Sequence, residues 1–210
     1  VEVVFGLPGV QVMQLYDGFW ENPEVRIIST RHEQATVYMA DGYARTTGKI
    51  GVALVVPGPG LYNACAALST AYAASSPVLL ISGQVDSDAI GQNRDALHQV
   101  HDQLEIVKPV TKWAHRVMRV EEIPETIHEA MRQLKTGRPR PVEIEISPDT
   151  LAAVADIAAA QALIIAVPAA AAVPTNHPAR MRPAKQAHVR DTVRWLLPIV
   201  MVSALNPLPW

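Results

Sequence analysis

The sequence predicts an α/β fold, with a doubly wound, mostly parallel sheet and helices on both of its faces. Over residues 1–148, short β-branched runs alternate with longer helical patterns, as they do in successive βαβ units. Residues 52–56 and 78–81 are apolar without alternating polar positions. That pattern is typical of central parallel strands that are covered on both faces.

The individual elements follow from the same alternation. Strands are expected at residues 3–5, 26–29, 51–56, 78–82 and 142–146, and helices at residues 10–20, 34–46, 61–74 and 122–134. Residues 83–103, after the fourth strand, form a polar stretch that is longer than most connections in compact domains. Two interpretations remain open for this stretch: a solvated surface excursion, or a loop that folds over a ligand or a partner subunit.

The character of the sequence changes after residue 150. Residues 151–173 are dominated by alanine, and residues 174–210 are rich in proline, arginine and histidine. We therefore expect one domain over residues 1–150, lacking its extreme N-terminus, and a linker with an incomplete or non-native continuation over 151–210, as a shifted reading frame would produce. The apolar residues 157–173 are shorter than the ~20 needed to span a bilayer, so no membrane span is expected.

Composition narrows the class of partner. The formal net charge is −2 and there is no long basic run, which argues against nucleic acid and anionic membranes and favours small-molecule chemistry. The single cysteine, Cys65, is expected to be a small buried residue and not a reactive thiol. The first residues lack the basic region of a secretory signal, so a cytoplasmic location is expected, and the absence of an initiator Met suggests a start inside a gene product.

The run Arg31-His32-Glu33-Gln34 follows the predicted strand at 26–29 and opens the next helix. It places the Glu33 carboxylate at the carboxyl edge of a parallel strand, where open α/β sheets bind their ligands. One interpretation is structural, because a carboxylate near a helix start is favoured by the helix dipole by ~0.3–1 kcal/mol. The other is functional: in an apolar pocket, the carboxylate would share a proton with a ligand nitrogen.

A second motif, Pro57-Gly58-Pro59-Gly60-Leu61-Tyr62-Asn63, joins the strand at 51–56 to a helix. Glycines at such a turn let the backbone approach a ligand, and prolines stiffen it. Asn63 stands where a dinucleotide fingerprint needs its third glycine, and no Gly-Lys-Ser/Thr follows, so dinucleotide and P-loop sites are excluded. A stiff turn that only connects strand to helix remains the alternative.

These two motifs and several shorter ones, in this order, resemble those of thiamine-diphosphate-dependent enzymes, specifically the pyrimidine-binding domain of the acetolactate synthase group. The shorter matches are Phe5-Gly6-Leu7-Pro8-Gly9, Ser82-Gly83-Gln84, Val110-Thr111-Lys112-Trp113 and Gly137-Arg138-Pro139-Arg140-Pro141-Val142. Leu7 replaces a residue that is often aromatic in acetolactate synthases, and Arg140 replaces the usual glycine. The resemblance covers about the first seven-tenths of the chain and implies a flavodoxin-like pyrimidine-binding domain.

The resemblance also implies roles for individual residues. Glu33 would be the catalytic residue that holds the pyrimidine nitrogen of thiamine diphosphate and starts its proton relay. The turn with Pro59 and Asn63 would pack against the aminopyrimidine ring. The full set of residues implied to bind the cofactor is Leu7, Glu33, Gly58, Pro59, Asn63, His98 and Gln99.

His98 and Gln99 are both included because the family places a glutamine or histidine near here that reaches toward the active site. A metal site at His98, His101 and Asp102 fits the spacing but lacks a second cluster of ligands, so no metal residues are assigned. Asp41 and Arg45 lie four residues apart on the predicted second helix and are explained by an ion pair.

The resemblance implies a missing half as well. Members of the family hold the diphosphate through Mg²⁺ at a Gly-Asp-Gly motif in another domain, and some bind FAD in a middle domain. No Gly-Asp-Gly occurs in this sequence. The chain would therefore hold only the pyrimidine half of the cofactor, without the strong charge-assisted contacts to the diphosphate, and is expected to bind weakly and not to turn over alone.

Three hypotheses follow. The chain is a piece of an acetolactate-synthase-like enzyme of 2-oxo acid decarboxylation and carboligation, a subunit of a split enzyme, or a non-catalytic interaction domain. In the first two, a diphosphate-binding domain from another chain is the expected partner. Homo- or hetero-oligomers are expected because such a domain normally buries a broad face against its partner.

Overall fold

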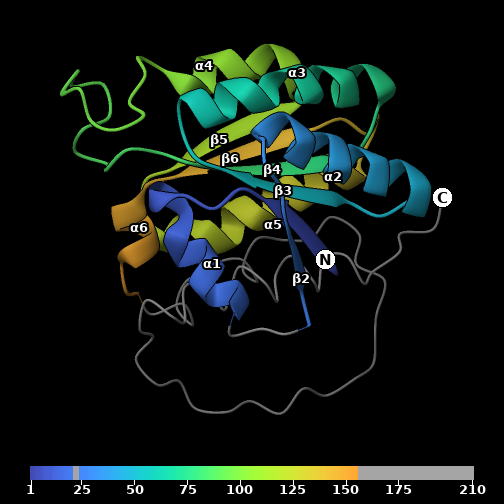
Figure 1. Ribbon diagram of the computed structural model, residues 1–210, viewed down its shortest axis with the longest axis horizontal. Coiled ribbons are helices and arrows are strands. Elements are labelled where there is room, and N and C mark those ends of the chain that lie inside the picture. Colours follow the sequence, from blue (N-terminus) through green and yellow to red (C-terminus); the bar gives the residue numbers. More distant parts are fainter. Residues whose placement is uncertain (21–23, 156–210) are drawn as a thin grey trace, which may run out of the picture.

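The computed structural model of the chain describes residues 1–20 and 24–155, so most of the predicted linker and continuation, including residues 157–173, lies outside it. Six parallel strands form one sheet in the order β2-β1-β3-β4-β6-β5 (Figure 1). The strands are β1 (Val3–Gly6), β2 (Arg26–Ser29), β3 (Gly51–Val55), β4 (Val78–Gly83), β5 (Trp113–Val117) and β6 (Val142–Ile146). Every neighbouring pair runs parallel.

Helices cover both faces of this sheet (Figure 1). One layer contains α2 (Glu33–Thr47), α3 (Pro59–Ala74) and α4 (Gln103–Val107), and the other contains α1 (Met13–Trp20), α5 (Ile123–Lys135) and α6 (Pro148–Ala152). Three short 3₁₀ helices, η1 (Val10–Val12), η2 (Lys108–Val110) and η3 (Val120–Glu122), precede α1, β5 and α5. The doubly wound fold predicted from the sequence is confirmed.

The central strands explain why two layers form. In β3, Val52 and Leu54 pack into one core cluster with α1 and α5, while Ala53 and Val55 pack into a second cluster with α2 and α3. All residues of β3 and β4 are buried, as their unbroken apolar runs predict. Burying apolar side chains on both faces stabilises each sheet–helix interface by ~25 cal/mol per Å² removed from water.

Three elements escape prediction from the sequence. Strand β5 reads Trp-Ala-His-Arg-Val and lies at the sheet edge, where most of its side chains are only half-buried. Helices α4 and α6 have five residues each, too few to show a helical period. Helix α6 crosses residue 150, and its Leu151 is fully buried in the core.

The remaining predicted elements lie within one or two residues of their observed bounds, apart from η1 at the start of the first predicted helix. The long polar connection also exists: no helix or strand occurs between the end of β4 at Gly83 and the start of α4 at Gln103. The chain reverses its direction of winding between β1 and β3, since β2 lies on one side of β1 and β3 on the other. Ligands of open α/β folds bind at the carboxyl edge of such a point.

Candidate functional site

Four strand ends meet at the carboxyl edge of the sheet where the winding reverses. The turn after β1 packs against the end of β3 so closely that a Cβ on Gly9 would lie 2.3 Å from Val56 Cγ1. A Cβ on Gly83, at the end of β4, would lie 2.9 Å from Pro57 Cδ. The predicted site residues that follow β1, β2 and β3 are thereby brought to one place.

Glu33 is the first residue of α2, and a local network fixes that position. His32 is the N-cap: its Nδ1 accepts a hydrogen bond of 3.1 Å from the Gln34 amide. Thr30 and Thr36 join through their hydroxyls at 2.5 Å, and the Thr30 amide donates to the Gly6 carbonyl of β1 at 2.9 Å. The start of α2 is therefore tied directly to the centre of the sheet.

The Glu33 carboxylate is only 9 % exposed and has one side-chain partner in the described part of the chain, Asn63 of α3. The Asn63 amide donates to Glu33 Oε2 at 3.0 Å. The other oxygen, Oε1, lies 3.3 Å from the point that a Cβ on Gly60 would occupy. One oxygen is thus held by the protein, and the other faces the glycine turn between β3 and α3.

That turn, residues 57–60, has an unusual backbone. Gly58 has a φ of +54°, in the region that favours glycine, and a Cβ at this position would lie 2.1 Å from the His98 carbonyl oxygen. Gly58 is the N-cap of α3 and Pro59 occupies the first turn, where a proline costs no helical hydrogen bond. Pro59 is exposed, although its two neighbours are buried.

The other predicted cofactor-binding residues have different surroundings. Leu7 is half-buried after β1, and its amide donates to the Leu54 carbonyl at 3.3 Å. His98 lies beside the turn through its backbone carbonyl and has a φ of +65°. The Gln99 side chain instead bonds within its own loop, to the Ala96 amide at 3.0 Å and the Ala89 carbonyl at 2.7 Å.

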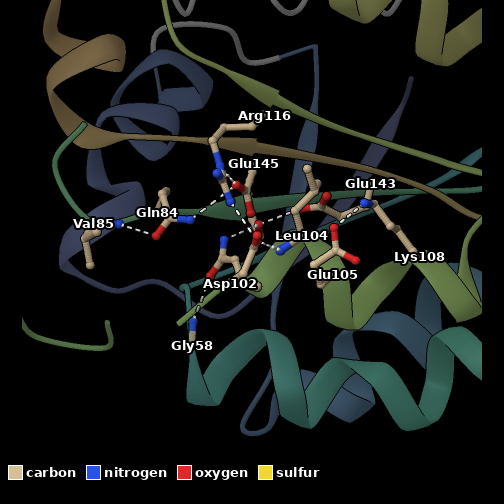
Figure 2. A network of polar contacts seen from close by, with 12 residues as sticks. Gly58, Gln84, Val85, Asp102, Leu104, Glu105, Lys108, Arg116, Glu143 and Glu145 are labelled. Carbon is tan, nitrogen blue, oxygen red and sulfur yellow. Dashed lines mark hydrogen bonds and ion pairs between the residues drawn. The ribbon is translucent and has the colours of Figure 1, made fainter. Parts of the chain in front are cut away.

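Sequence reasoning missed a buried polar network behind the turn (Figure 2). Glu143 and Glu145 of β6 are both fully buried. Glu145 accepts from Gln84 at 3.2 Å and pairs with Arg116 of β5, and Arg116 also pairs with Asp102 at 3.0 Å. Burial, followed by the repulsion of Glu145, raises the pKa of Glu143 well above its ordinary value.

A signal for this network exists in the sequence. Residues 142–146 read Val-Glu-Ile-Glu-Ile, and such alternation normally predicts a strand with one solvated face. Here the polar face of β6 lies under α4, so both carboxyl groups need partners inside the protein. Arg116, the penultimate residue of the preceding strand β5, is the cation that pairs with Glu145.

The structure also describes the surroundings of other residues that the sequence singles out. Asp41 and Arg45 form the expected i,i+4 ion pair at 2.7 Å. Cys65 is half-buried on α3, and burial raises the pKa of its thiol. Within residues 1–20 and 24–155, no three His, Cys, Asp or Glu side chains are grouped to hold a metal ion, and Asp102 instead caps α4. No helix in this part of the chain is long and apolar enough to cross a membrane.

Comparisons with known proteins agree with the motifs. Residues 1–106 match the family model described as "Thiamine pyrophosphate enzyme, N-terminal TPP binding domain". The acetolactate synthase large subunit of Haemophilus influenzae is 47 % identical over 151 residues, which are 72 % of this chain and 26 % of the relative. A probable 2-ketoarginine decarboxylase of Pseudomonas aeruginosa is 42 % identical over 153 residues, 73 % of this chain and 27 % of the relative.

A solved structure shows the same fold. The thiamine-diphosphate-dependent 4-hydroxybenzoylformate decarboxylase of Rhodococcus jostii RHA1 has a TM-score of 0.66 and 28 % sequence identity to this chain. The similarity covers 71 % of this chain and 28 % of that one. The chain therefore spans about a quarter of the length of the relatives it matches.

Proposed function

Because this chain belongs to the thiamine-diphosphate-dependent enzymes, as an N-terminal domain like that of acetolactate synthases, we propose that it binds the pyrimidine half of thiamine diphosphate through Glu33. The observation that carries the proposal is the buried carboxylate at the carboxyl edge of the sheet, with Oε2 fixed by Asn63 at 3.0 Å. An acid in such a place can hold one ring nitrogen and exchange a proton with it.

The surrounding residues fit an aminopyrimidine. Oε1 of Glu33 faces the 57–60 turn, where Gly60 leaves open the space that a Cβ would take 3.3 Å away. Pro59 is exposed on the same turn and would contact the ring, with Gly58, Leu7 and the loop at His98 and Gln99 as further proposed contacts. When bound, thiamine diphosphate supplies the carbanion chemistry, while this chain supplies position and protonation.

Glu33 has the proton-relay role in this proposal. Asn63 donates to one oxygen and so leaves the other as the site where a proton is held or released. Glu33 is also the first residue of α2, so its carboxyl group lies at the amino end of that helix, beside the ligand site. The full protein would decarboxylate a 2-oxo acid and join the product to a second carbonyl compound, a proposal supported by the acetolactate synthases among its relatives.

The diphosphate and Mg²⁺ would be held by a second domain that carries Gly-Asp-Gly, a motif absent from this sequence. We propose that this domain comes from another chain in a homo- or hetero-oligomer, and that FAD, where used, also binds outside residues 1–150. In the split-subunit hypothesis, the second domain is always a separate polypeptide. In the non-catalytic hypothesis, no such domain completes the site.

Titration calorimetry of the full chain with thiamine diphosphate and Mg²⁺ tests the proposal, alone and with a partner domain that carries Gly-Asp-Gly. We expect weak binding alone and tighter binding with the partner. Loss of a hydrogen bond to a charged group costs ~1.5–3 kcal/mol, so Glu33→Gln should weaken binding roughly ten- to hundredfold.

Glu125→Gln is the matched control, because Glu125 is an exposed carboxylate on α5, in the helix layer opposite α2. It should leave the affinity unchanged. Equal affinities of the unaltered chain and Glu33→Gln would remove Glu33 from the site. A complete lack of binding, even with the partner domain present, would leave the non-catalytic hypothesis in place.

A further inference from the structure

Gln103, the first residue of α4, connects three backbone segments behind the turn. Its side chain is fully buried. Its Oε1 accepts a hydrogen bond of 3.1 Å from the Gly58 amide, and its Nε2 donates to the Gly83 carbonyl at 2.8 Å. One side-chain amide therefore links the β3–α3 turn, the end of β4 and the start of α4.

The position of Gln103 is itself fixed from outside. The preceding residue, Asp102, caps α4 by accepting a hydrogen bond of 3.1 Å from the Leu104 amide. The same Asp102 oxygen pairs with Arg116 at 3.0 Å, and Arg116 pairs with buried Glu145. Figure 2 shows Arg116 of β5 between Glu145 of β6 and Asp102, with which it pairs. A shift of the start of α4 would therefore break the partly exposed ion pair between Asp102 and Arg116.

A line of hydrogen bonds continues inward from the turn. The Gly58 amide donates to Gln103, the Gln103 amide reaches Ser82 Oγ at 3.4 Å, and Ser82 donates to Glu143 Oε1 at 2.6 Å. All donors point in the same direction, so each bond polarises the next. The turn is thereby anchored to the centre of the sheet and not only to its own strand.

The turn needs such an anchor because the buried Gly58 amide must have an acceptor. In the described part of the chain, that acceptor is Gln103 Oε1. An unpaired buried amide costs ~1–3 kcal/mol. Without Gln103, the Gly58 amide would have to find another acceptor, and the resulting shift of the turn would move Pro59 and α3, which carries Asn63.

We propose that Gln103 is a positioning residue for the pyrimidine site: it fixes the Gly58 backbone and, through it, the placement of Pro59 and Asn63 opposite Glu33. The proposal rests on the proposed function for its ligand. A positioning role differs from a purely stabilising one in what depends on the Gln103 side-chain amide. Both the geometry of the 57–60 turn and the affinity of the site for its ligand must depend on it.

Hydrogen exchange, followed residue by residue by NMR in the full chain, tests the first step without any cofactor. We expect a protected Gly58 amide in the unaltered chain. In Gln103→Met, which keeps the length but loses both polar atoms, Gly58 should exchange at least tenfold faster, by the factor that ~1.4 kcal/mol represents. Gln103→Glu, which keeps an acceptor for the Gly58 amide, should restore part of the protection.

Thr111→Val is the matched control. Thr111 is buried and donates to the Val107 carbonyl at 2.8 Å, near the amino end of β5, away from the turn. It should lower the melting temperature to a similar degree but leave Gly58 exchange unchanged. A merely structural role for Gln103 would give the same exchange at Gly58 in both variants. If neither variant folds, rapid Gly58 exchange in the folded unaltered chain would still overturn the proposal.

The second step is a calorimetric titration with thiamine diphosphate and Mg²⁺, with the partner domain present. Gln103→Met should bind at least tenfold more weakly and Thr111→Val should bind as the unaltered chain does. Unaltered affinity in Gln103→Met overturns the positioning role while leaving the proposed function intact. Absence of binding by the unaltered chain overturns the proposed function, and the exchange experiment then decides on its own whether Gln103 fixes the turn.

Discussion

Two roles are proposed for Glu33, one in the stability of α2 and one in ligand binding, and its position allows both. It is the first residue of α2, where a negative charge stabilises the helix by ~0.3–1 kcal/mol, and it presents a free oxygen to the 57–60 turn. The two roles have different magnitudes. Replacing the charge costs at most about 1 kcal/mol in stability, whereas a tenfold or greater loss of affinity requires a direct contact with the ligand. Comparing melting temperature with affinity therefore separates them.

Alanine substitutions at two glycines, Gly58 and Gly42, should change the stability of the fold in opposite directions. Gly58→Ala should destabilise the fold by ~1–3 kcal/mol or more, since it combines a positive φ with a collision against the His98 carbonyl at 2.1 Å. Gly42→Ala should stabilise it by ~0.5–1 kcal/mol, because Gly42 lies within α2 and a Cβ there meets nothing within 4 Å.

Thermal unfolding of the two variants measures both effects. One kcal/mol corresponds to ~2–4 °C for a chain of this size, so the melting temperatures should move in opposite directions. A Gly58→Ala variant as stable as the unaltered chain would show that the turn is free to rearrange, against the geometry described above.

At the scale of elements, the sequence predicts what periodicity can show. Strands β3 and β4 are continuous apolar runs buried on both faces, and their prediction follows directly from hydrophobicity. Strand β5 is missed because an edge strand has few buried residues to set its pattern. Glu33, the 57–60 turn and Asn63 are found by motif and by their place after strands.

Gln103 and Glu143 could not be found in that way. A glutamine in a polar loop and a glutamate in an alternating strand are both patterns of solvated side chains, yet in the folded chain both residues are fully buried. Their function depends on contacts between residues 20 to 61 positions apart in the chain, which no local pattern encodes.

Strand β6 also predicts a pH dependence of stability. Burial and the repulsion of Glu145 raise the pKa of folded Glu143 above its ordinary 4.5, which the unfolded chain retains. Above about pH 4.5 the folded state holds one more proton than the unfolded state, so this group makes stability fall as pH rises. Glu143→Gln, which is neutral at every pH, should be relatively more stable at pH 8 than at pH 5.

Urea unfolding at a series of pH values between 4.5 and 8 measures the effect. The informative quantity is the difference in unfolding free energy between the variant and the unaltered chain, because groups that titrate equally in both cancel. Glu125→Gln, with an exposed carboxyl group, should give a difference that does not change with pH. A flat difference for Glu143→Gln as well would show that Glu143 ionises in the folded protein as readily as in the unfolded one.

For the molecule as a whole, the position of the proposed site indicates which contacts to the cofactor another domain would supply. All the proposed contacts lie at the carboxyl edge of one sheet. They would bind only the pyrimidine end of a long, charged cofactor. The sequence has no Gly-Asp-Gly, the motif proposed to hold the Mg²⁺-bound diphosphate. A second domain that faces this edge would complete the site. This chain then needs a surface on which that domain can dock.

Helices α2 and α3 are the proposed face, since their outer sides expose Tyr38, Met39 and Tyr62 by 39–41 %. We expect the full chain to self-associate when its partner is absent, because such apolar surface is normally covered. In sedimentation velocity the average mass should rise with loading concentration. The double variant Tyr38→Lys with Met39→Lys should remain monomeric, while Met118→Lys, whose exposed side chain follows β5, should associate like the unaltered chain. A concentration-independent monomer for the unaltered chain would exclude this face as an interface between copies.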